Sequence, residues 1–165
     1  RTRSCRLTEA AGLRPALTRR GAPSRLEAGP RRVVKSGPMA LVGLLLGGAL
    51  GTVARYLVGL ASHALFAGAY PVGTLVVNVL GCFLMGLLSG LRQTGPVSPA
   101  TYLALGTGFL GAFTTFSTFA LDAHTLGQEG GWSRASLYVL ANLVLGYLAL
   151  LLGRATVLLL GGGAG

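Results

Sequence analysis

The pattern of hydrophobic and polar positions divides residues 39–165 into four long apolar segments. They run over about 40–67, 72–91, 100–125 and 133–160. Each has the ~20 apolar residues that a helix needs to cross ~30 Å of hydrocarbon. Helices are expected because an open strand leaves backbone groups unsatisfied in lipid. Short connections with turn residues separate the segments, at 68–71, 92–99 and 127–131.

Composition agrees with a membrane protein. Hydrophobic residues make up 52% of the chain and charged residues only 11%, against about 25% charged residues in ordinary soluble domains. The net charge of +10 is local, because ten of the fourteen Lys and Arg residues and two of the four acids lie in residues 1–38. The body is therefore almost uncharged, and its composition does not indicate nucleic-acid binding. Cys5 and Cys82 predict no disulfide framework, and Cys82 is expected to pack as a small apolar residue.

Residues 1–38 are rich in Arg, Pro and Gly and lack an apolar run that could form a core. We expect this basic extension to be disordered. It has no h-region, so it does not match a signal peptide. It fits a transit peptide, a basic arm on the membrane surface, or sequence upstream of the true start. We favour Met39 as the natural start, because it stands immediately before the first apolar segment, and residues 39–165 as the transmembrane domain.

Charge gives the body little preference for one orientation. Four spans place both ends and the 92–99 connection on one face, which carries Arg92 and Arg154, while Arg134 lies on the other. So small a difference in Arg count is a weak positive-inside signal. The sequence therefore predicts that the body can insert in both orientations, unless the basic extension holds the N-terminus in the cytoplasm.

The third segment combines glycines with a run of hydroxyl side chains. These residues are Gly106, Gly108, Gly111, Thr114, Thr115, Ser117 and Thr118. Glycine destabilises a helix by about 1 kcal/mol relative to alanine, and Ser and Thr compete for backbone hydrogen bonds. Together they predict an interrupted helix near 111–114. Broken helices within a membrane expose carbonyl and N–H groups that bind ions.

Several residues in the segments each allow two interpretations. Arg55 can snorkel to the interface or stand at the mouth of an anion path; at i+4 from Gly51 it points to the packed side. Asn78 and Asn142 can clamp two helices together, or their amides can donate to an anion without adding a fixed charge. Phe116 and Phe119, three residues apart on one helix face, can pack in a core or turn their positive ring edges to an ion.

Three stretches resemble a known family, the fluoride-specific ion channels of the Fluc (CrcB) type. They are 47-GGALGTVARY-56, 71-PVGTLVVNVLG-81 and, most specifically, 106-GTGFLGAFTTFSTF-119. The resemblance covers about 43–160. It implies passive export of fluoride from the cytoplasm by an all-α protein of the inner (plasma) membrane. It also implies four transmembrane helices per subunit, a third helix broken at mid-membrane, and an antiparallel, dual-topology homodimer.

The resemblance also implies roles for particular residues. A structural Na⁺, which is not transported, would be held by backbone carbonyls of Gly111 and Thr114. The fluoride pore would be lined by Asn78, Phe116, Phe119, Ser117, Thr118, Tyr138 and Asn142. Arg55 would stand in the vestibule.

A small dual-topology, proton-coupled exporter is the alternative. Such a carrier needs an acid within the membrane, but Asp122 lies near the end of the third segment and Glu129 in a predicted connection. An intramembrane enzyme would need a base beside its nucleophile, and His63 and His124 are not in the middle of a segment. A purely structural bundle explains the glycines but not the Thr and Ser run.

Overall fold

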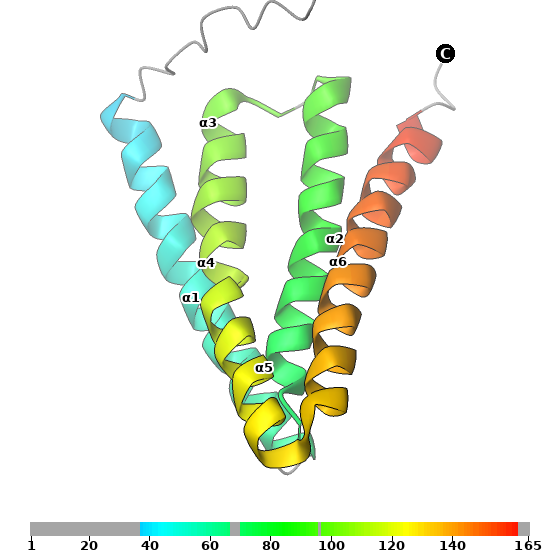
Figure 1. The fold of residues 1–165 in the computed structure, drawn as a ribbon. Coiled ribbons are helices and arrows are strands. Elements are labelled where there is room, and N and C mark those ends of the chain that lie inside the picture. The colour runs from blue at the N-terminus through cyan, green and yellow to red at the C-terminus, as the bar shows by residue number, and fades with distance from the viewer. Residues whose placement is uncertain (1–36, 67–69, 96, 162–165) are drawn as a thin grey trace, which may run out of the picture. The chain divides into compact units, whose positions relative to one another are not determined.

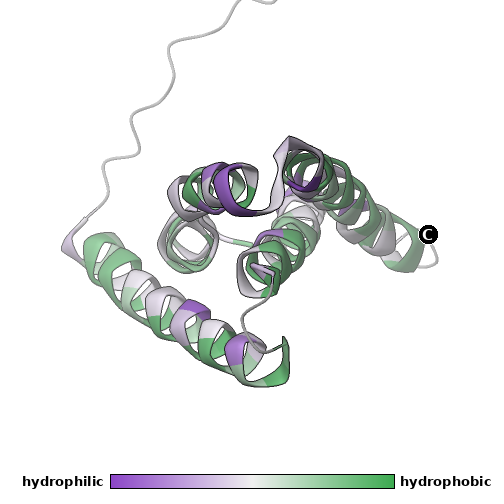
Figure 2. Cartoon of the chain, turned by 60° about the horizontal axis from the view of Figure 1, so that its bottom comes forward, coloured by the Kyte–Doolittle hydropathy of each residue, from purple (hydrophilic) through white to green (hydrophobic). Residues whose placement is uncertain are grey.

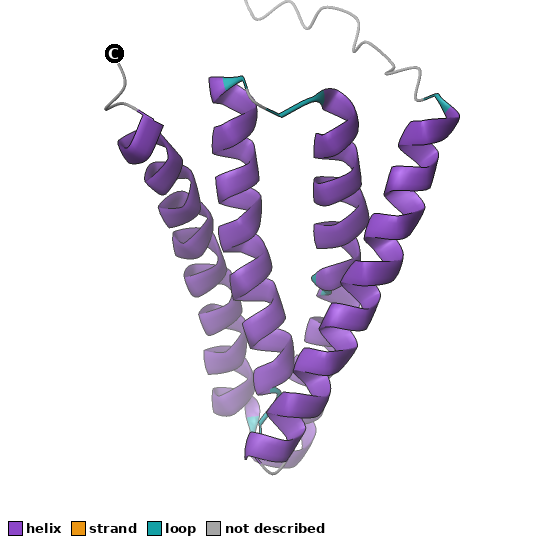
Figure 3. Cartoon of the chain, turned by 180° about the vertical axis from the view of Figure 1, so that it is seen from behind, coloured by secondary structure: helices purple, strands orange, loops and turns teal. Residues whose placement is uncertain are grey.

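The structure, a computed structural model, describes residues 37–66, 70–95 and 97–161. Within those ranges every regular element is a helix (Figure 3). Four helical stretches are long and apolar enough to cross a membrane: α1 (Pro38–Phe66), α2 (Val72–Thr94), the third segment (Pro99–Gly130) and α6 (Trp132–Gly161). The prediction of four helices able to span a membrane is confirmed. The predicted disorder of the basic extension concerns residues 1–38, of which 1–36 lie outside the described residues, and Pro38 is the first residue of α1.

Two connections are shorter than the sequence predicted. The helix α2 continues through Arg92 and ends at Gly95, which has φ 105° and donates its N–H to the carbonyl of Leu91. The stretch Gly127–Gly130 belongs to a helix, and the turn follows at Gly131, with φ 86°. Positive φ is accessible to glycine without a steric penalty. The helices therefore end where a glycine takes that conformation, and not where glycines first occur.

The third segment consists of four helical pieces. They are α3 (Pro99–Tyr102), the π-helix η1 (Leu103–Leu110), α4 (Gly111–Phe113) and α5 (Phe116–Gly130). Thr114 and Thr115 have extended backbones between α4 and α5, and the segment bends by 19°. The predicted interruption is present and centred just after 111–114. The π-helix was not predicted; its wider turn lies in the glycine-containing stretch LALGTGFL.

Glycines bring the helices into close contact in two pairs. In the first pair α2 packs on α6, where a Cβ on Gly86 would overlap the carbonyl of Leu150, and a Cβ on Gly153 that of Phe83. In the second pair α1 packs on η1 and α4, where a Cβ on Gly51 would overlap the carbonyl of Phe109. Figure 1 shows these pairs side by side. Such contacts suit lipid, where close packing drives helix association.

Most large apolar side chains of the described residues point outward. Examples of more than half-exposed residues are Leu45, Leu57, Leu140 and Leu152. Seen from the end, hydrophobic residues recur all along α1 and α6 (Figure 2). An apolar exterior of this kind is what lipid requires. The start of α1, the connection after α2 and the end of α6 lie at one end of the helices (Figure 1).

Candidate functional site

The centre of the third segment is shaped by two neighbouring threonines with different tasks. Thr114 ends α4: its Oγ1 donates to the carbonyl of Leu110 at 3.0 Å, and its backbone N–H donates there too. Thr115 starts α5: its Oγ1 accepts from the N–H of Thr118 at 3.2 Å, an ordinary N-cap bond. The chain thus closes one helix and opens the next within two residues.

Asn78 of α2 supplies the hydrogen bonds that the interrupted backbone lacks. Its Oδ1 accepts from the N–H of Thr115 at 2.9 Å, and its Nδ2 donates to the carbonyl of Thr115 at 3.2 Å. Thr115 is extended, with φ −150° and ψ 120°, so its N–H and C=O point to the same side. The side-chain amide therefore pairs with Thr115 much as a residue on a neighbouring strand would.

Asn142 of α6 completes this network from the other side. Its Oδ1 accepts from Nδ2 of Asn78 at 3.1 Å, and its own Nδ2 donates to the carbonyl of Tyr138 at 3.1 Å. A backbone N–H can only donate, so the N–H of Thr115 requires the oxygen of the Asn78 amide to face it. The nitrogen of Asn78 then faces Asn142 and requires the amide oxygen of Asn142 to face Asn78. Asn78 and Asn142 thus link α2 to α6, which is one of the two interpretations that the sequence allowed, and Asn78 also binds the backbone at the helix break.

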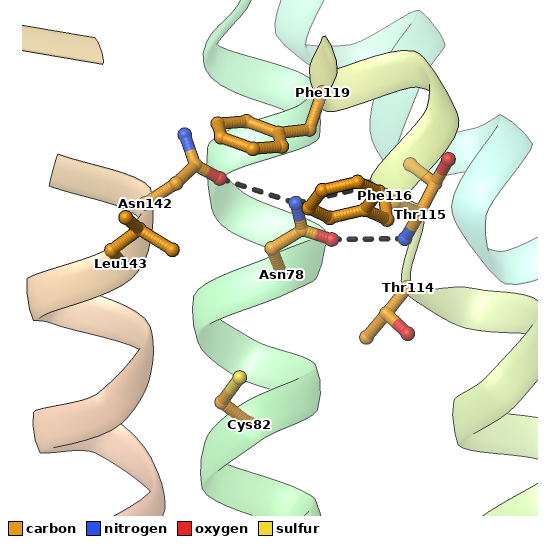
Figure 4. Close-up of a pocket in the computed structure, with 8 residues that line it drawn as sticks. All are labelled: Asn78, Cys82, Thr114, Thr115, Phe116, Phe119, Asn142 and Leu143. Atoms are coloured by element: carbon orange, nitrogen blue, oxygen red, sulfur yellow. Dashed lines mark hydrogen bonds between the residues drawn. The ribbon is translucent and has the colours of Figure 1, made fainter. Parts of the chain in front are cut away.

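A cavity of about 240 Å³ opens beside this network. Its lining consists of Asn78, Cys82, Thr114, Thr115, Phe116, Phe119, Asn142 and Leu143. Figure 4 shows these side chains coming from α2, α6, the break in the third segment and the first turn of α5. The polar groups among them are amides, hydroxyls and a thiol, and no carboxylate lines this cavity. The cavity therefore offers neutral donors and aromatic rings within a largely apolar wall.

The two phenylalanines are neighbours in very different surroundings. Their ring centroids are 5.5 Å apart with the planes tilted by 54°. Phe119 is 7% exposed and packs on the ring of Tyr138 at 5.7 Å, whereas Phe116 is 76% exposed. The sequence predicted that both rings share one helix face, and it gave no sign of this difference.

Tyr138 lies between Phe119, which lines the first cavity, and Asp122, which lines a second one. It is fully buried, its hydroxyl donates to Oδ2 of Asp122 at 3.2 Å, and Tyr70 meets its ring edge-on. Asp122 lines the second cavity, also of about 240 Å³, together with Ser62, His63, Tyr70 and Thr74, among others. Tyr138 thus lies behind Phe119 and does not itself line the first cavity.

The remaining predicted residues lie outside the first cavity. Ser117 and Thr118 are exposed, and their hydroxyls lie 3.5 and 3.0 Å from Oγ1 of Thr115. Arg55 is half-buried on α1, and among the described residues no hydrogen bond to its guanidinium is found. Three lining residues, Cys82, Thr115 and Leu143, were not predicted as site residues. Cys82 could have been found, since it lies one helical turn from Asn78.

The break leaves backbone oxygens that suit a hard cation. In a continuous helix the N–H of Thr115 would donate to the carbonyl of Gly111, but here it donates to Asn78. The extended Thr114 likewise turns its carbonyl away from a helical ladder. Carbonyl oxygens are suitable ligands for hard cations. The residues expected to hold Na⁺ therefore fit such a role. Elsewhere in the described ranges, no group of three His, Cys, Asp or Glu side chains could hold a metal ion.

Comparison with known proteins places these features in a family. Residues 42–154 match the family described as CrcB-like protein, Camphor Resistance (CrcB). The chain is 46% identical over 112 residues to a fluoride-specific ion channel FluC of Shewanella sp. (strain ANA-3), covering 68% of this chain and 90% of that protein. Proteins of the same name from Shewanella oneidensis and Shewanella baltica give the same identity and coverage. The matched region contains every residue that lines the first cavity.

Proposed function

Since the chain belongs to the CrcB family, we propose that it forms a fluoride-specific ion channel that lets fluoride leave the cytoplasm passively. The observation that carries this proposal is the cavity at the helix break. Neutral amide and hydroxyl groups and two aromatic rings line it, without a carboxylate. A carboxylate there would repel an anion, and a fixed positive charge would hold it too tightly for rapid release.

The chemistry of the lining suits a small, strongly hydrated anion. Removing water from an ion in a low-dielectric medium costs roughly tens of kcal/mol. Donors and positive ring edges spread along a path can replace that water in steps. Conduction requires several moderate sites, because a single deep site would trap the ion.

The residues of the proposed path fall into three groups. Asn78, Phe116, Phe119 and Asn142 line the cavity at the break. Tyr138 lies behind Phe119, and Ser117 and Thr118 lie on the exposed side of α5. Arg55 on α1 would attract the anion from a vestibule. In this proposal, Ser117, Thr118 and Arg55 act where the path leaves the cavity.

We propose that two copies assemble as an antiparallel homodimer in the inner (plasma) membrane, each copy inserted in the opposite orientation. Two observations support this. The charge difference between the two faces of the body is small, and the side of the break that carries Phe116 is open in the single chain. A second copy crossing there would cover Phe116 and bring two breaks together. A structural Na⁺ held by carbonyls of Gly111 and Thr114 would then lie between the copies without being transported.

Fluoride efflux from liposomes tests the function. Vesicles loaded with fluoride and chloride and containing the purified full chain should release fluoride passively and retain chloride. The proton-coupled exporter predicts instead that fluoride release depends on a pH gradient and slows when a protonophore removes it. Equal release of chloride would contradict fluoride specificity.

Reporters on the C-terminus test the assembly. The full chain and a version starting at Met39 should be compared, because the basic extension adds positive charge before the first span. We expect the shorter version to populate both orientations and the longer one to be biased towards a cytoplasmic N-terminus. A single orientation of the shorter version would contradict an antiparallel homodimer.

A further inference from the structure

A third cavity, a groove of about 390 Å³, opens between α2 and α6 where the two helices end. It is lined by Leu87, Leu91, Thr94, Thr156, Val157, Leu160 and Gly161. The two threonine hydroxyls donate to carbonyls of their own helices, those of Leu91 and Leu152. The groove therefore presents an almost purely apolar wall. The helices move apart towards this end (Figure 1 and Figure 3).

Two exposed arginines lie at the edge of this groove. Arg154 is on the face of α6 that carries the lining Val157, one turn further on. Its guanidinium donates to Oε1 of Gln93 at 3.0 Å, so it reaches the level at which α2 ends. Arg92 is in the last turn of α2, and its guanidinium donates to the carbonyl of Val97 at 2.7 Å. Both partners are neutral, so they leave both positive charges uncompensated.

The part of the chain that the structure describes places no carboxylate at this end of α2 and α6. The described residues within 87–105 and 151–161 include no Asp or Glu, and Asp122 and Glu129 belong to α5. A helix dipole favours a cation in the last turn, which accounts for the arginine of α2. It does not account for Arg154, which lies seven residues before the end of α6. The charge of Arg154 is therefore available to a partner outside the chain.

We propose that this groove binds an anionic phospholipid of the surrounding membrane. One acyl chain lies between α2 and α6, and the phosphate of the headgroup meets Arg92 and Arg154. A guanidinium suits phosphate because its planar fork donates two hydrogen bonds at once. Basic pockets between membrane helices bind anionic headgroups in this manner. A zwitterionic lipid also offers an acyl chain, but its headgroup brings a second positive charge to the arginines. The proposal does not depend on what the protein transports.

Native mass spectrometry of the purified full chain in detergent tests the charged part of the site. The readout is the lipid concentration at which half of the protein carries one lipid. Phosphatidylglycerol should need an at least about tenfold lower concentration than phosphatidylcholine with the same acyl chains, because two arginines face its headgroup. Arg154→Gln should raise the value for phosphatidylglycerol about fivefold, as expected for one basic residue. Arg154→Lys should stay closer to the parent. Arg134→Gln, near the other end of α6, is the matched control and should leave the value unchanged.

A pair of neighbouring leucines tests the apolar part. Leu159 and Leu160 are 80% and 79% exposed, so neither holds the fold together, but only Leu160 lines the groove. Leu160→Ser should raise the half-occupancy concentration of phosphatidylglycerol at least about threefold, because apolar contact with the acyl chain is lost. Leu159→Ser should leave it unchanged.

Four outcomes would overturn the proposal. Equal half-occupancy concentrations for the two lipids would show that any lipid covers the groove. Binding of phosphatidylglycerol that does not respond to Arg154→Gln would place the lipid elsewhere, for instance on the basic extension. Displacement of phosphatidylglycerol by excess inorganic phosphate would show a site for phosphate alone. Loss of dimers in Leu160→Ser with unchanged lipid binding would show that a second copy of the chain covers the groove.

Discussion

The α2–α6 pair and the break in the third segment are held by different means. The two helices of the pair run without interruption and meet through glycines, with backbone against backbone at Gly86 and Gly153. The third segment contains a π-helix and a break, and its central Thr115 is held by side-chain hydrogen bonds from Asn78. The chain thus places close apolar packing where it needs a scaffold and polar bonds where it needs a site.

This contrast explains how a break can persist in a membrane protein. Backbone groups freed in lipid cost several kcal/mol each if they find no partner. The N–H and C=O of Thr115 find theirs on α2, which is itself held against α6 by glycine contacts. The α2–α6 pair therefore holds the side-chain amide of Asn78 in the position where it binds the N–H and C=O of Thr115.

The largest expected effect comes from a substitution that disturbs the packing of α2 on α6. Gly86→Ala places a Cβ against the backbone of Leu150, which cannot move without separating α2 from α6. We expect the free energy of unfolding in detergent to fall by at least about 2 kcal/mol. Gly146→Ala on α6 is the control: its nearest neighbour would be Sγ of Cys82 at 3.4 Å, an ordinary contact. That variant should be neutral or up to ~1 kcal/mol more stable, and equal losses would refute the packing account.

A double substitution tests the contact between α2 and the break in the third segment. A Cβ on Gly81 of α2 would overlap the Cγ2 methyl of Thr114. Gly81→Ala alone should therefore cost about 1–3 kcal/mol. Thr114→Ser removes that methyl, keeps a hydroxyl for the carbonyl of Leu110 and should be mild by itself. In the double variant most of the cost should disappear, and a double-mutant cycle of unfolding free energies measures the coupling. Additive costs would show that the two residues do not press on each other.

The two phenylalanines sharpen the comparison, because one is part of the packing and the other is not. Phe119→Ile should cost about 1 kcal/mol of stability, since the ring packs between Phe116 and Tyr138. Phe116→Ile should change the stability of the single chain by less than ~0.5 kcal/mol, because that ring is 76% exposed. Both variants should conduct fluoride poorly if ring edges face the ion. Unfolding and liposome efflux are measured side by side, and parental efflux in both variants would make the rings packing residues only.

The smallest effect concerns the cap that starts α5. Thr115→Val loses the oxygen that accepts from the N–H of Thr118 and should cost about 1 kcal/mol. Thr115→Ser keeps the oxygen and should lie within ~0.5 kcal/mol of the parent. Thermal unfolding in detergent distinguishes the two. If Thr115→Val is as stable as the parent, the cap contributes nothing; if Thr115→Ser loses as much as Thr115→Val, the methyl group contributes as much as the cap.

Prediction from the sequence succeeded where a local pattern fixes the outcome. The apolar segments predicted four spans, and the glycines and threonines around Gly111 and Thr114 predicted the interruption, because each depends on neighbours in the chain. It was less accurate at helix ends. Arg92 and Gly127 were assigned to connections but lie in helices, since a glycine ends a helix only where the backbone takes a positive φ.

By itself, the sequence determined that this is an all-α membrane protein with an interrupted third span and polar residues within its spans. Only the tertiary structure decided which of those polar residues meet. Thr115 and Asn142 follow Asn78 by 37 and 64 positions along the chain. Neither helical spacing nor hydropathy relates these three residues. It also separated the buried Phe119 from the exposed Phe116. Hydrophobic length is a property of one segment, whereas the partner of a side-chain amide depends on how closely glycines let three segments approach.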